Sequence, residues 1–186
     1  MDATLREPGR RQRLVVLTLF AALSAAAEAA AESSRSLPAP GAPAPIPFFV
    51  DRRLGSGLRE TLEEAARRLS DSRCQEILTD FTDGKGRTLA ENLRVAGQSM
   101  PRYLGLVLFY DGSETETCAN ARVLAWTSPG SRAVHVCWSQ FSYWQRQKPG
   151  YAANIVIHEA LHTLGLRESP PLPGEITERV IERCGP

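Results

Sequence analysis

The sequence predicts an α+β domain, in which helices pack on a small sheet. Apolar residues recur at helical spacing between positions 54 and 96. Three apolar runs typical of strands follow between positions 103 and 138, and a long helical pattern begins at Tyr151. An α+β fold accommodates this order of helices, then strands, then a further helix. We expect this domain to cover residues 48–186.

Two segments precede the predicted domain. Residues 1–31 begin with four arginines, continue with an uncharged and mostly apolar run from Leu14 to Ala27, and end in small residues, as a secretory signal peptide does. The apolar run is short for a membrane span, so we expect no stable membrane insertion of the mature chain, with an uncleaved anchor as the alternative. Residues 32–47 are rich in proline and alanine and predict a linker. The expected location is secreted or periplasmic.

Charge and cysteine content narrow the class of protein. The net charge is +1, which gives no overall basic field for nucleic acid. The four cysteines form no CxxC pair, and an even number of them in an exported chain indicates two disulfides. Three pairings are possible. We expect Cys118–Cys137, which flanks a predicted hairpin, and Cys74–Cys184, which ties the C-terminal end to an early helix.

The elements follow in order along the domain. A short strand is expected at 48–50, followed by an amphipathic helix at 55–70, two helical turns at 74–81 and a weaker helix at 89–96. The apolar runs at 103–110, 122–127 and 133–138 predict strands, with a turn at 128–131. The last helical pattern begins at Tyr151 and stops at Gly165, a residue suited to a left-handed helix end. Spacing of the apolar residues after position 175 predicts a short final helix.

The stretch VIHEALHTLGLRE, at positions 156–168, indicates a metal site. Residues four apart on a helix share a face, so His158 and His162 can bind one zinc ion. Glu159 follows the first histidine and can serve as general base, taking a proton from a zinc-activated water. A helix that carries these letters without any metal is the alternative interpretation.

The stretch resembles the zincin metallopeptidases, and more narrowly the metzincin pattern HExxHxxGxxH. His158, Glu159, His162 and Gly165 match that pattern, and Glu168 stands where the third histidine would fall. The resemblance implies a twisted small sheet with packed helices, the active-site helix near the C-terminus, and zinc-dependent hydrolysis of peptide or protein substrates. The chain departs from metzincins because no methionine follows the motif. It is also similar to a small secreted bacterial family of uncharacterised proteins with a related motif.

The sequence leaves the third zinc ligand and the activity open. Glu168 is the first candidate for the ligand, and Glu175, Glu178 and Glu182 on the final helix are the others. The functional alternative to a peptidase is a non-catalytic secreted binding protein on a zincin scaffold, with structural zinc or none. His135, in a predicted strand, is expected to be a packed or surface residue. Substrate preference and oligomeric state are not predicted.

Overall fold

A four-stranded sheet organises residues 45–186, the part of the chain that the computed structural model describes. The strands are β1 (Phe49–Val50), β2 (Leu108–Asp111), β3 (Ala125–Thr127) and β4 (Ala133–Val136). Their order is β1-β2-β4-β3; the first three are parallel, and β3 at the edge is antiparallel to β4. The α+β class is therefore confirmed. The expected signal peptide and the first part of the expected linker lie outside the described residues.

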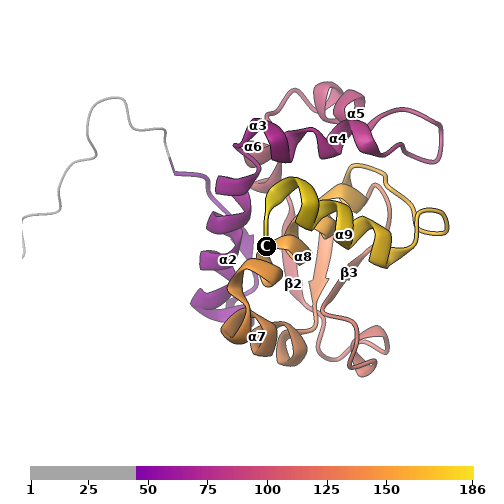
Figure 1. Ribbon diagram of the computed structural model, residues 1–186. Coiled ribbons are helices and arrows are strands. Elements are labelled where there is room, and N and C mark those ends of the chain that lie inside the picture. Colours follow the sequence, from indigo (N-terminus) through magenta and orange to yellow (C-terminus); the bar gives the residue numbers. More distant parts are fainter. Residues whose placement is uncertain (1–44) are drawn as a thin grey trace, which may run out of the picture. The chain divides into compact units, whose positions relative to one another are not determined.

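Helices precede and follow the sheet strands along the chain (Figure 1). Their bounds are α2 (Gly55–Arg68), α3 (Ser72–Gln75), α4 (Ile77–Asp80), α5 (Leu89–Val95), α6 (Met100–Leu104), α7 (Trp138–Gln147), α8 (Pro149–Thr163) and α9 (Pro173–Cys184), with 3₁₀ turns η1 (Arg52–Leu54) and η2 (Thr117–Ala119). Helix α8 packs against α2, α7, α9 and the edge strand β3. Every residue from Ala152 to Thr163 is buried, as expected of a helix enclosed on all sides.

The predicted strand at 103–110 is wrong in its first half. Pro101 stands in the first turn of α6, a position where proline favours a helix, and Tyr103 and Leu104 are buried on that helix. The strand begins only at Leu108. A continuous apolar run does not distinguish a buried helix from a buried strand, which explains the error.

The other boundaries differ mainly at the ends. The expected strand at 133–138 stops at Val136, because Trp138 begins α7, a helix that the sequence analysis did not predict. The strand expected at 122–127 shortens to β3, and the two turns expected at 74–81 form the separate helices α3 and α4. Gly165 has a φ of 106°, which confirms the expected left-handed stop after α8.

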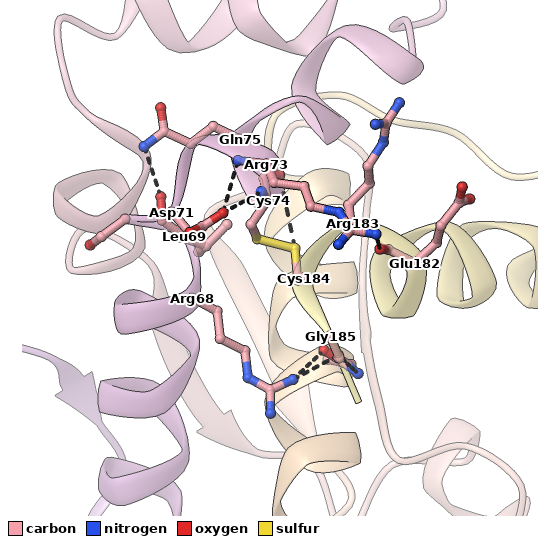
Figure 2. Close-up of a disulfide and its surroundings, with 12 residues drawn as sticks. Arg68, Leu69, Asp71, Arg73, Cys74, Gln75, Glu182, Arg183, Cys184 and Gly185 are labelled. Carbon is pink, nitrogen blue, oxygen red and sulfur yellow. Dashed lines mark hydrogen bonds between the residues drawn. A yellow bond between two sulfur atoms is a disulfide. The ribbon is translucent and has the colours of Figure 1, made fainter.

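Both expected disulfides are present. Cys118–Cys137 joins η2 to the residue after β4, on either side of the β3–β4 hairpin, and Cys74–Cys184 joins α3 to the end of α9. Figure 2 shows the second bridge, with arginine side chains that contact the same end of the chain. Bridges of this kind are typical of chains that fold in an oxidising compartment. Within residues 45–186, no helix has the length and apolar character needed to cross a lipid bilayer.

Candidate metal centre

Helix α8 presents two histidines on one face. His158 and His162 stand one turn apart, and their Nε2 atoms are 3.0 Å from each other. Both residues are buried, with 6% and 4% of their surfaces exposed. The helical spacing predicted from the sequence thus brings the two ring nitrogens to a single point.

The turn after α8 brings a carboxylate to the same point. The N–H of Gly165 donates to the carbonyl of His162, and the positive φ of Gly165 turns the chain back toward the helix. Glu168 Oε1 then lies 3.2 Å from His162 Nε2 and 3.7 Å from His158 Nε2. A Cβ on residue 165 would stand 3.2 Å from the Cβ of Asp83, so glycine also fits the space.

The far nitrogen of each imidazole has its own partner. His162 Nδ1 lies 2.9 Å from the carbonyl oxygen of Leu166, and His158 Nδ1 lies 3.0 Å from Thr177 Oγ1 on α9. A carbonyl can only accept, so the His162 proton is on Nδ1 and the Nε2 of the neutral ring keeps its lone pair. This lone pair points into the site, as a metal-ligating histidine requires.

The three converging atoms fit a zinc ion. Ligands at 2.0–2.1 Å from a tetrahedral zinc are separated from one another by roughly 3.3–3.4 Å. The three pairs here are 3.0, 3.2 and 3.7 Å apart, so shifts of a few tenths of an ångström would accommodate the ion. Unprotonated imidazole nitrogens and a carboxylate oxygen are all electron-pair donors, so the three atoms can bind one cation placed between them.

The surroundings set the charge of the site. Burial lowers the pKa of His162, which favours the neutral ring that binds metals. The imidazoles of His158 and His162 hold the pKa of Glu168 below its usual range, which keeps this carboxylate ionised. The carboxylate form of Glu168 is therefore stabilised at neutral pH.

Glu159 follows His158 in the sequence, but its side chain is not one of the three that converge. It is almost fully buried, and its Oε2 is one of two buried side-chain polar atoms in residues 45–186 without a hydrogen-bond partner, the other being Trp126 Nε1. Burial, and to a smaller extent the charge of Glu168, raises the pKa of Glu159 to about 8. A buried carboxyl without a partner is costly for stability alone, which indicates a functional role.

A cavity of about 700 Å³ opens onto these residues. The side chains of Tyr151 and Ile155, from the first half of α8, line it together with the motif residues. Its other walls are the segment Arg122–Thr127, which includes the edge strand β3, and the beginning of α9. The cavity thus extends from the three ligand atoms along a strand edge.

The other predicted candidates lie elsewhere. Within the described residues, Glu168 is the carboxylate grouped with the two histidines. Glu175 accepts a hydrogen bond from the backbone N–H of Leu172 at the start of α9, and Glu182 is exposed beside Arg179. Glu178 lines the cavity but is not part of the group.

His135 is not grouped with the three converging side chains. It pairs with Trp126 across β3 and β4, and the two rings stack at 4.3 Å. Tyr110 lies on its other side, with ring centroids 5.9 Å apart. His135 is therefore a packed strand residue, as the sequence analysis expected.

Sequence reasoning missed the residues that support the site. Asn92 on α5 donates to Asp83 Oδ2 and to the carbonyl of Leu164, so it fastens the turn that leads to Glu168. Asp83 also pairs with Leu166 in an isolated bridge. Thr177 contacts His158 from a helix nineteen positions later in the chain. No periodicity or motif marks these residues, because they come together only through tertiary packing.

Comparison of the chain with models of known protein families, with curated proteins and with solved structures finds no match. An interpretation of the site consequently depends on its residues and their geometry.

Proposed function

We propose that this protein is an exported zinc-dependent peptidase. The observation that carries the proposal is the convergence of His158, His162 and Glu168 beside the buried, unpaired carboxyl of Glu159. Three protein ligands leave room for water at a fourth position, which is the arrangement of catalytic rather than structural zinc. The resemblance to the zincin motif supports the same activity.

Each residue has a defined task in this proposal. His158, His162 and Glu168 would hold the ion, which supplies positive charge that acidifies a water molecule and polarises the substrate carbonyl. Glu159, which lines the same cavity, accepts the proton of the attacking water and donates it to the leaving amine. Burial raises the pKa of Glu159, so its carboxylate accepts a proton more readily than that of an exposed glutamate.

The edge strand offers a place for an extended peptide. Among residues 45–186, strand β3 pairs with β4 on one side only, and the segment that contains β3 lines the cavity. An extended chain can add to such an edge through backbone hydrogen bonds, which do not depend on its side chains. A peptide bound in this way would pass close to the two histidines. We therefore propose peptide or protein substrates.

The alternative is a non-catalytic secreted binding protein on the same scaffold. A site closed to solvent would favour it. The side chain of Glu168 is 44% exposed, and the three ligand residues and Glu159 all line the cavity. This accessibility supports the enzyme over the binding protein.

Substitution of Glu159 by glutamine tests the proposal. Gln keeps the size of the side chain but cannot take up a proton, so we expect zinc content to be unchanged and peptide hydrolysis to fall by about 10²–10⁴-fold, the usual contribution of a general base. Turnover is measured on a mixed peptide library with the zinc-loaded mature chain. Glu182→Gln, an exposed change on α9, is the control. Equal hydrolysis by wild type and Glu159→Gln would refute the assignment.

A further inference from the structure

The two histidines of the site have partners of different chemistry. His162 Nδ1 faces the carbonyl of Leu166, which can only accept a proton. His158 Nδ1 faces the hydroxyl of Thr177, which can either donate or accept. The side chain of His158 is only 7% exposed, so water is a poor substitute for this partner. The tautomer of His162 is therefore fixed, whereas that of His158 is free to change.

Two arrangements of His158 follow from these contacts. The 3.0 Å between the two Nε2 atoms is a hydrogen-bond distance, and His162 offers a lone pair there. In protein stripped of metal, His158 can fill this contact by donating its Nε2–H, and Thr177 then donates to His158 Nδ1. When Nε2 binds a cation, the proton of the neutral ring is on Nδ1 and Thr177 accepts it. Rotation of one hydroxyl serves both arrangements.

We propose that Thr177 is the positioning residue of the metal site, acting on His158 as a donor before the ion binds and as an acceptor afterwards. The inference rests on the metal site of the proposed function. The ring of His158 carries one proton in each arrangement, since one proton leaves Nε2 and one is taken up at Nδ1. The buried ring keeps a hydrogen bond throughout, so the ligand is held in place before and after the ion arrives.

Helix α9 is fastened firmly enough to hold the hydroxyl in position. Ile176 and Val180 on its inner face are fully buried. At its end, Cys184 is bonded to Cys74, and Arg73 Nη2 donates to the carbonyl of Glu182 at 3.1 Å (Figure 2).

Further contacts hold the same end of α9. Arg68 Nη1 donates to the carbonyl of Gly185 at 2.9 Å, and the guanidinium of Arg183 binds both carboxylate oxygens of Asp80. The elements that receive these contacts, α2, α3 and α4, all lie between β1 and β2 in the chain. The position of Thr177 is thus set by the packing of the whole domain rather than by the motif.

Three variants of the disulfide-bonded mature chain test the assignment. Thr177→Val removes the hydroxyl at nearly constant volume, and Thr177→Ser retains it. Thr163→Val is the control, because Thr163 on α8 is more deeply buried than Thr177 and its hydroxyl donates to the Ala160 carbonyl, not to either histidine. The zinc dissociation constant is measured by competition with a chromogenic chelator. The tautomer of His158 is read from the ¹⁵N shifts of its ring nitrogens, with the protein stripped of metal and then loaded with zinc.

We expect Thr177→Val to weaken zinc binding by roughly 10–100-fold, the usual effect of losing an outer hydrogen bond to a ligand. Thr177→Ser and Thr163→Val should bind like wild type, and the His158 proton should move from Nε2 to Nδ1 on zinc loading. Equal affinities of wild type and Thr177→Val, or an equal loss in Thr163→Val, would overturn the role of Thr177 alone. Absence of zinc binding by wild type would instead overturn the metal site, and the role of Thr177 with it.

Discussion

Removal of the two disulfides should destabilise the domain unequally. Cys74–Cys184 closes a segment of sequence separation 110, and Cys118–Cys137 one of separation 19. Loop-closure entropy then gives about 4.8 kcal/mol for the first bridge and about 3.2 kcal/mol for the second. The loop closed by Cys118–Cys137 lies within the loop closed by Cys74–Cys184. It shortens the path between Cys74 and Cys184 by 19 residues, which changes the logarithm of the loop length little. With the long path shortened in this way, the contribution of Cys74–Cys184 is about 4.6 kcal/mol, and the expected difference is about 1.4 kcal/mol.

Urea unfolding of the mature chain measures this difference. The variants are the double substitutions Cys74→Ala/Cys184→Ala and Cys118→Ala/Cys137→Ala, each of which keeps the other bridge. Cys74, Cys118 and Cys137 are all at most 5% exposed, whereas Cys184 is partly buried, so loss of the missing sulfurs costs somewhat more packing at the Cys118–Cys137 bridge and narrows the difference. An equal or larger loss on removing the short-loop bridge would refute the entropic reasoning and indicate that local packing around Cys118–Cys137 dominates.

Two further predictions concern the turn after α8 and an ion pair on α2. Gly165→Ala places a side chain at φ 106° and 3.2 Å from Asp83 Cβ, so it should cost about 1–3 kcal/mol and weaken zinc binding. Gly174→Ala, with no atom within 4 Å of the new Cβ, should leave zinc binding unchanged and should not destabilise the fold. Equal zinc affinity of the Gly165→Ala variant would contradict the role of the turn. Arg67, and then Arg68, lower the pKa of Glu64 to about 2, so this carboxylate stabilises the fold above pH 4.5 and the gain is lost as pH falls toward 2. The stability difference between wild type and Glu64→Gln in urea should therefore shrink over that range, and a constant difference would count against the ion pair.

The residues of the candidate site could be predicted from the sequence, whereas the residues that hold them in position could not. Helical spacing placed His158 and His162 on one face, and the conformational freedom of Gly165 allowed the turn, so Glu168 could be named as a candidate. Glu168 could be preferred over the glutamates of α9 only from the fold, because the position of α9 depends on the Cys74–Cys184 bridge and on buried contacts.

Errors in the predicted elements have a similar origin. The apolar run at 103–110 was divided between α6 and β2, since burial alone does not select a helix or a strand. Helix α7 was missed because just two of its ten residues, Phe141 and Ser142, are buried, which leaves a weak pattern for a helix that packs against α8. Thr177 could not be found at all, since its role arises from a contact between distant helices.

The zinc content of the mature chain, produced in an oxidising compartment, tests the central claim most directly. It is measured for wild type, His158→Ala and Glu168→Ala after incubation with zinc and removal of the excess. The account predicts about one zinc per chain in the wild type, consistent with a single three-ligand site. It predicts loss of the ion in His158→Ala and weaker binding in Glu168→Ala. A wild-type chain without zinc, or equal zinc content in His158→Ala, would contradict the metal centre and favour the non-catalytic binding protein.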